Sequence, residues 1–102
     1  AYADGARYEG GMRNDKMHGG GVLVTANGDR YEGDFHSGMR FNRGRLTATN
    51  GYEYNGEWVR DERSGKGMQA FPNGSRYTGG WQNDERNGAG VFQYKSTKDM
   101  GG

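Results

Sequence analysis

Large apolar residues recur along the chain at an interval of 23 positions, separated by polar residues and glycine. Each unit has a tyrosine, a glycine two positions later and a large apolar residue four positions later. The tyrosines are Tyr8, Tyr31, Tyr54 and Tyr77, and the residues four positions later are Met12, Phe35, Trp58 and Trp81. Alternate residues of a strand point to opposite faces of a sheet, so this pattern predicts a strand with its rings and glycine on one face. A constant period over most of the chain indicates a repeat protein.

A second stretch of strand-forming residues follows in each unit, for example at 19–25 and 88–94, and predicts a return strand. Polar residues such as 60–64 join the two strands, and this length favours a hairpin loop. Asn-Gly pairs between units, such as Asn27-Gly28, are typical of tight β-turns. Together these signals predict an all-β fold, an elongated single-layer antiparallel β-meander of successive hairpins.

The positions that recur every 23 residues, called columns below, also set the predicted boundaries of the repeats. We expect a tail of a preceding repeat and a short C-terminal tail around four repeats. The predicted segments are the tail 1–7, the repeats 8–30, 31–53, 54–76 and 77–98, and the tail 99–102.

The glycines could allow a single-layer sheet to pack its own aromatic rings. The chain has 21 glycines, although glycine within a strand costs roughly 0.5–1 kcal/mol relative to alanine. Their fixed offsets from the tyrosines therefore suggest a steric requirement. We expect each ring to lie over a glycine of a neighbouring strand, where no Cβ obstructs it.

Composition and net charge limit the partners and the cellular compartment that we expect for the chain. The formal net charge is +1, so no overall field favours nucleic acid, and we expect no nucleic-acid partner. The chain has no cysteine and no apolar run long enough to cross a membrane, which favours a cytoplasmic protein.

The units Tyr31-Glu-Gly-Asp-Phe35, Tyr54-Asn-Gly-Glu-Trp58 and Tyr77-Thr-Gly-Gly-Trp81 resemble MORN (membrane occupation and recognition nexus) repeats. Two departures are Met12 in place of the first aromatic residue and Asn42 in place of a glycine. The resemblance implies a β-meander. It also implies a range of settings that includes lipid kinases, junctional membrane proteins, ciliary spokes and cytoskeletal scaffolds.

No constellation indicates catalysis, and we expect no enzyme activity and no cofactor. His18 and His36 have no second ligand at metal-binding spacing, so we predict no metal site. Carboxylates that recur every 23 residues are typical of a solvated ladder rather than an acid/base pair.

The leading functional hypothesis rests on the aromatic rings that recur in each repeat, called the ring column below. A single-layer sheet is not expected to bury all of these rings. An exposed aromatic stripe usually marks an interface, so we predict a groove for an amphipathic helix, a peptide or a like chain. The predicted groove residues are Tyr31, Phe35, Tyr54, Trp58, Tyr77 and Trp81. The alternative is that the rings only stack on glycines and on each other.

A second functional hypothesis rests on the arginines of the second repeat. Arg40, Arg43 and Arg45 could form a basic spot for an anionic phospholipid head group, and the alternative is a solvated face of loop salt bridges. The sequence thus predicts a non-enzymatic scaffold that binds a protein or self-associates, in a cytoskeletal or ciliary assembly, with a peripheral membrane adaptor as the alternative.

Overall fold

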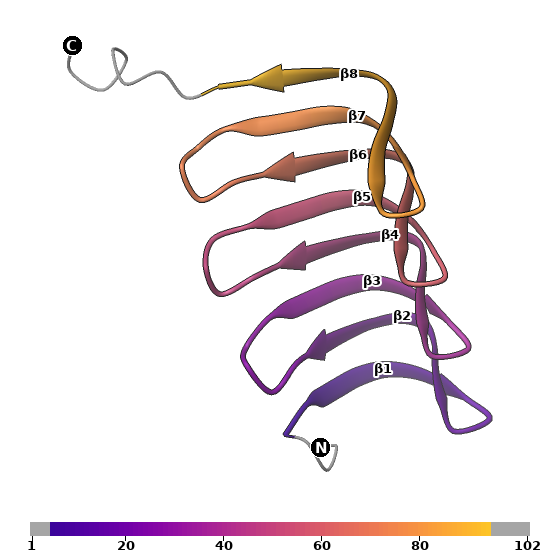
Figure 1. The fold of residues 1–102 in the computed structure, drawn as a ribbon. Helices are drawn as coiled ribbons and strands as arrows, with labels where there is room; N and C mark the ends of the chain where they lie inside the picture. Colours follow the sequence, from indigo (N-terminus) through magenta and orange to yellow (C-terminus); the bar gives the residue numbers. More distant parts are fainter. Residues whose placement is uncertain (1–4, 95–102) are drawn as a thin grey trace.

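The computed structural model describes residues 5–94 and contains one open antiparallel sheet in which the eight strands follow sequence order (Figure 1). The strands are β1 (Arg7–Arg13), β2 (Lys16–Val24), β3 (Arg30–His36), β4 (Met39–Thr47), β5 (Glu53–Val59), β6 (Glu62–Ala70), β7 (Arg76–Gln82) and β8 (Glu85–Gln93). The molecule is elongated, with extents of 54 × 29 × 17 Å. The predicted all-β meander of hairpins is therefore confirmed. Most of the two predicted tails lies outside the described residues.

Each hairpin closes with a two-residue turn, and the two residues of every turn have positive φ. The turns are 14–15, 37–38, 60–61 and 83–84. Positive φ at both positions defines a type I′ turn, whose twist matches that of the flanking strands. The prediction that 60–64 form the connection was therefore wrong, since β6 already begins at Glu62. The return strands likewise begin before their glycines, with β2 starting at Lys16.

The Asn-Gly pairs do form the turns between repeats, as predicted, and the two residues have different roles. Glycine alone adopts positive φ, as at Gly51 with 97°. Asparagine instead accepts a hydrogen bond, because the backbone N–H of Tyr52 donates to Asn50 Oδ1 at 2.9 Å. Such a side-chain acceptor two residues back is an Asx-turn, which fixes the bend without strain in the asparagine backbone.

A bulge bends every return strand. In β6, Gly67 pairs with Gly56 and Arg63 pairs with Trp58, so three residues of β6 oppose one of β5. The middle residue of each bulge has positive φ, and these residues are Gly19, Asn42, Gly65 and Gly88. This explains the departure at Asn42, since asparagine is the side chain that best tolerates left-handed backbone. The strands bend sharply beside the hairpin turns (Figure 1), so the sheet is curved rather than flat.

The predicted glycine sockets are confirmed. A Cβ built on Gly67 would lie 2.4 Å from Cζ of Tyr54 on the neighbouring strand. The facing glycine, Gly56, has the Cα of Gly67 itself 2.4 Å from its Cβ position. The equivalent glycine and ring recur as Gly44 with Tyr31 and Gly90 with Tyr77. Only glycine allows the backbones and the ring to approach so closely.

No part of the chain that the structure describes forms a helix able to span a membrane.

Candidate functional site

The ring column forms the core of the molecule. Tyr54 is 0% exposed and Trp58 is 2% exposed, and the other four predicted groove residues are buried as well. The expectation that a single-layer sheet leaves these rings exposed was therefore wrong. The bulges curve the sheet around the rings, which are covered by one another and by arginines of neighbouring hairpins.

The rings form one continuous zigzag from repeat to repeat. Tyr31 and Tyr54 each contact the large ring of their own repeat and that of the next repeat edge to face, whereas Tyr8 contacts Phe35 and Tyr77 contacts Trp81. The order is Tyr8, Phe35, Tyr31, Trp58, Tyr54, Trp81, Tyr77, with centroid distances of 4.9–5.6 Å. Such contacts contribute roughly 0.5–1.5 kcal/mol each beyond area burial. The repeats are thus joined by a common core.

The polar atoms of the buried rings are satisfied by backbone carbonyls. Trp58 Nε1 donates to the Gly44 carbonyl at 3.1 Å, and the Tyr54 hydroxyl donates to the Glu57 carbonyl at 2.9 Å. Burial raises the pKa of Tyr54 to about 12 and raises the pKa of Tyr31 still further. Burial therefore favours the neutral form of these two hydroxyl groups.

An arginine ladder covers the rings from the turn side. The Arg40 guanidinium lies 4.3 Å from the ring centroid of Trp58, and that of Arg63 lies 4.4 Å from Trp81. Each arginine also pairs with a carboxylate 21 residues further on. Arg40 Nε lies 3.1 Å from Asp61, and Arg63 Nε lies 2.7 Å from Asp84.

The same ladder includes the backbone. The backbone N–H of Arg63 donates to Asp84 Oδ1 at 3.1 Å, and Asp84 N–H donates to the Arg63 carbonyl at 3.0 Å. Burial opposes ionisation of Asp84, but the hydrogen bonds from Arg63 outweigh it and hold the pKa of that carboxyl below its usual value. Each pair joins two successive hairpins, so the ladder ties consecutive repeats together.

The predicted basic spot is not brought together. Arg40 packs over the rings, whereas Arg43 and Arg45 alternate along β4 with Gly44 and Leu46, which face the rings. Arg43 and Arg45 therefore point to the opposite face of the sheet, and Arg45 pairs with Glu53. The role of these arginines in lipid binding stays a prediction.

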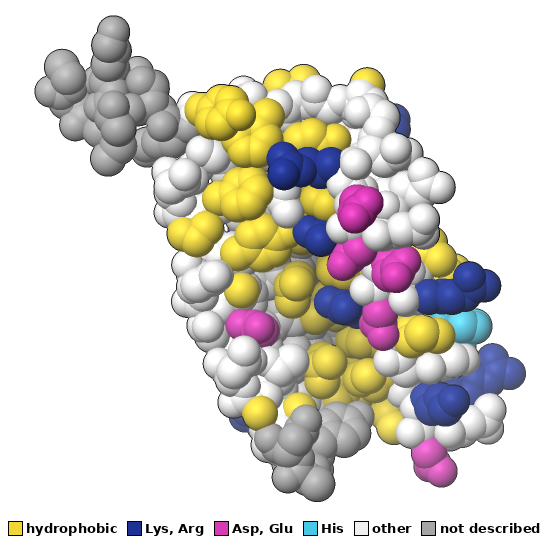
Figure 2. Space-filling model, viewed as in Figure 1, with side chains coloured by type: hydrophobic (Ala, Val, Ile, Leu, Met, Phe, Trp, Pro, Cys, Tyr) yellow, Lys and Arg dark blue, Asp and Glu magenta, His cyan; other side chains and the backbone are white. Residues whose placement is uncertain are grey.

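An exposed apolar surface lies at the β8 end instead. Phe71 and Phe92 stack at 5.9 Å, Phe92 contacts Tyr94 at 4.4 Å, and Tyr94 is 79% exposed. With Pro72 they line a shallow hollow of about 370 Å³. Figure 2 shows hydrophobic side chains gathered at this end and in a band along the sheet bordered by charged side chains. This surface was not predicted from the sequence, although three aromatic residues outside the tyrosine and tryptophan positions of the repeat, Phe71, Phe92 and Tyr94, indicate it.

The two histidines, 18 residues apart in sequence, lie side by side with ring centroids 4.9 Å apart. Within residues 5–94, no group of three or more His, Cys, Asp or Glu side chains could hold a metal ion.

Comparison with protein families agrees with this architecture. The family model described as "MORN repeat" matches residues 8–30, 31–51, 54–76 and 77–97. A search of curated proteins gave no match. MORN repeats are interaction modules for proteins and membranes, and the resemblance drawn from the ring and glycine columns is confirmed. The chain belongs to the MORN repeat family.

Proposed function

We propose that the chain is a non-enzymatic scaffold segment that assembles end to end with a second copy of itself, the β8 edge of one copy docking on the β1 edge of the next. The observation that carries this proposal is the inter-repeat ladder, whose next arginine and preceding aspartate stand at opposite ends of the described sheet. Arg86 continues the column of Arg40 and Arg63, and Asp15 continues the column of Asp61 and Asp84.

Both ends offer one half of an inter-repeat contact. At the β8 end, the Arg86 guanidinium lies 5.3 Å from the Tyr77 ring centroid, as the other ladder arginines lie over their own tyrosines. At the β1 end, Met12 occupies the tryptophan column and is 55% exposed. Within residues 5–94, neither Arg86 nor Asp15 forms a salt bridge. By repeat position, Met12 and Asp15 of one copy would meet Tyr77 and Arg86 of another, and Asp15 and Arg86 carry opposite charges.

The backbone register supports the same pairing. Between internal repeats, Gly67 pairs with Gly79 and Gly65 pairs with Trp81. The same register would place Gly90 of one copy opposite Gly10 of the next, and Gly88 opposite Met12. Since β1 and β8 each have one neighbouring strand within the described sheet, both edges retain hydrogen-bonding groups for such a ladder.

The proposal is tested by the oligomeric state of residues 1–102, measured by sedimentation at increasing concentration. We expect the wild type to associate with rising concentration. Arg86→Glu and Asp15→Arg should each remain monomeric, because each puts like charges at the junction. An equimolar mixture of the two variants should associate again, since the intact Arg86 end of one meets the intact Asp15 end of the other.

Arg43→Glu is the matched control, because it reverses a charge on the opposite face of the sheet and should leave association unchanged. Circular dichroism should show all variants folded, because Arg86 and Asp15 are exposed. A monomeric wild type, or a mixture that stays monomeric, would contradict the proposal. Association that survives both reversals would place self-association on another surface and would also contradict the proposal.

The other hypotheses are weaker on this geometry. A protein that docked on the ring face would meet Arg40 and Arg63 before it met the rings. A cytoskeletal or ciliary setting rests on the family resemblance alone. A peripheral membrane adaptor stays an alternative, although Arg40, Arg43 and Arg45 do not lie on one common surface.

A further inference from the structure

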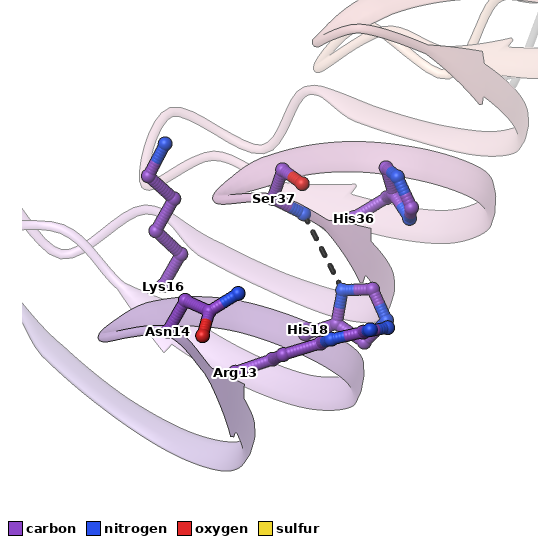
Figure 3. Close-up of a pocket in the computed structure, with 6 residues that line it drawn as sticks. All are labelled: Arg13, Asn14, Lys16, His18, His36 and Ser37. Atoms are coloured by element: carbon purple, nitrogen blue, oxygen red, sulfur yellow. Dashed lines mark hydrogen bonds between the residues drawn. The ribbon is translucent and has the colours of Figure 1, made fainter.

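A pocket rich in hydrogen-bond donors lies beside the turns of the first two hairpins, away from the rings and from the β8 edge. It encloses about 350 Å³. Figure 3 shows its six lining residues, which are Arg13, Asn14, Lys16, His18, His36 and Ser37. None of the six carries a carboxylate, and all six carry a group able to donate a hydrogen bond.

The charges and the donors converge from different elements. Arg13 ends β1, Lys16 begins β2, and His36 ends β3. The backbone N–H of Ser37 donates to His18 Nδ1 at 3.5 Å, the bond drawn in Figure 3. Because Nδ1 accepts this bond, the neutral imidazole carries its proton on Nε2 and can donate it to a ligand.

The repeat itself does not require these residues. The columns of tyrosine and glycine recur in all four repeats, but the Lys16 column continues as Met39, Glu62 and Glu85. The corresponding edge of the third and fourth repeats is therefore acidic. Packing accounts for the recurring residues and leaves this basic cluster unexplained.

The basic charges are also not neutralised from within the described chain. No salt bridge involves Arg13 or Lys16 among residues 5–94. Asp34 on β3 is engaged by Asn42, whose Nδ2 donates to it at 3.0 Å. Asp15 directly precedes Lys16 in the sequence but does not line the pocket.

We propose that this pocket binds a polyphosphate group, that is, a ligand with two or more linked or neighbouring phosphoryl groups. Phosphate presents acceptor oxygens in every direction and several negative charges. Guanidinium, ammonium and imidazole N–H groups match those acceptors with charge-assisted hydrogen bonds. The pocket borders the β1 side of the proposed end-to-end junction, since Asn14 and Lys16 flank Asp15, but none of its six lining residues is assigned a contact in that junction.

Calorimetric titration of residues 1–102 with inorganic pyrophosphate tests the site. We expect saturable binding that weakens at least tenfold in the double variant Arg13→Ala/Lys16→Ala. The double variant Arg43→Ala/Arg45→Ala removes the same charge from the opposite face, and its affinity should stay within about twofold. All four residues are exposed, so both variants should keep the fold. Equal weakening in the two double variants, or no binding by the wild type, would overturn the proposal.

Imidazole NMR signals supply a readout that diffuse charge attraction would not move. Pyrophosphate should shift the signals of His18 and His36 with the same dissociation constant as the calorimetry. Histidine signals that do not move at saturation would contradict the site.

Vesicle flotation distinguishes the source of the phosphate. Phosphatidylcholine vesicles are compared with and without a phosphatidylinositol bisphosphate, in the presence and absence of pyrophosphate. Flotation that requires the phosphatidylinositol bisphosphate and is competed by pyrophosphate supports the site with a membrane source. Pyrophosphate binding without flotation supports it with a soluble source. Flotation that pyrophosphate does not compete would place membrane binding elsewhere and overturn a shared site.

Discussion

The glycine under the Tyr54 ring allows the packing argument to be tested at one atom. Gly67→Ala would place a Cβ 2.1 Å from the hydroxyl oxygen of Tyr54, 2.4 Å from Cζ and 2.5 Å from Cε1. Ordinary carbon contacts lie at about 3.5–4 Å, so the ring must shift by roughly 1 Å. The ring has little room to move, because it is fully buried with Trp58 and Trp81 at centroid distances of 4.9 and 5.3 Å.

The magnitude follows from two opposing terms. Overpacking a fixed core costs about 1–3 kcal/mol, and three ring atoms in collision place Gly67→Ala at the upper end. Replacing a strand glycine by alanine returns about 0.5–1 kcal/mol of backbone entropy. We therefore expect Gly67→Ala to lower the free energy of unfolding by about 2 kcal/mol.

Gly20→Ala is the matched control. Gly20 also lies in a strand, but a Cβ there has no atom within 4 Å, and its φ is not left-handed. We expect this variant to gain about 0.5–1 kcal/mol. Urea unfolding followed by tryptophan fluorescence measures both variants, since Trp58 and Trp81 report on the same cluster. If the two variants differ in unfolding free energy by less than about 0.5 kcal/mol, the glycine socket does not operate.

Three further perturbations probe the polar side of the core. Arg63→Lys keeps the charge but loses the guanidinium fork on Asp84, so it should destabilise by about 1–2 kcal/mol in urea unfolding. Gln69→Leu removes the buried Oε1, which has no hydrogen-bond partner within the described residues, and also the Nε2 bond to the Tyr52 hydroxyl, which keeps Arg63 as a donor. Because a leucine occupies the same position in two other repeats, this variant should stabilise by about 1 kcal/mol in the same assay. The pKa of Tyr54 is raised by burial to about 12 from an ordinary value of about 10, so the folded state retains a proton that the unfolded state releases. Its contribution should be complete below pH 10 and decline between pH 10 and 12; a stability that is flat across that window would contradict burial of the hydroxyl.

The sequence was sufficient to predict the structural features that recur in every repeat. The tyrosine spacing fixed the period, and the glycine offsets predicted that rings of one strand lie over glycines of the next. Both are properties of local strand pairing, since a hairpin such as β5–β6 brings Tyr54 beside Gly67. The family followed from the same columns.

Curvature was the property that the pattern did not reveal. The glycine column that includes Gly65 was visible, but its left-handed backbone and the two extra residues of the bulge were not. Without the bend, a flat sheet leaves its rings exposed, which is why the aromatic stripe was predicted to be a surface. The offset of 21 residues between Arg63 and Asp84 was hidden for a related reason. It follows from the distance between adjacent hairpin turns and not from any spacing within a repeat.

The burial of the rings moves the proposed site of interaction to the two edges of the described sheet, and the reason lies in how a repeat is completed. Each internal tyrosine is covered by the large ring of the next repeat, and each internal arginine receives a carboxylate from it. A repeat array is stabilised by its interfaces as well as by its units, so an end that lacks a neighbour forgoes interface energy. A partner that supplied a carboxylate to Arg86 and an apolar side chain to Tyr77 would recover that energy with contacts already present between the internal repeats. Binding at the end should therefore raise the stability of the last hairpin most, which hydrogen exchange of the β7 and β8 amides would measure.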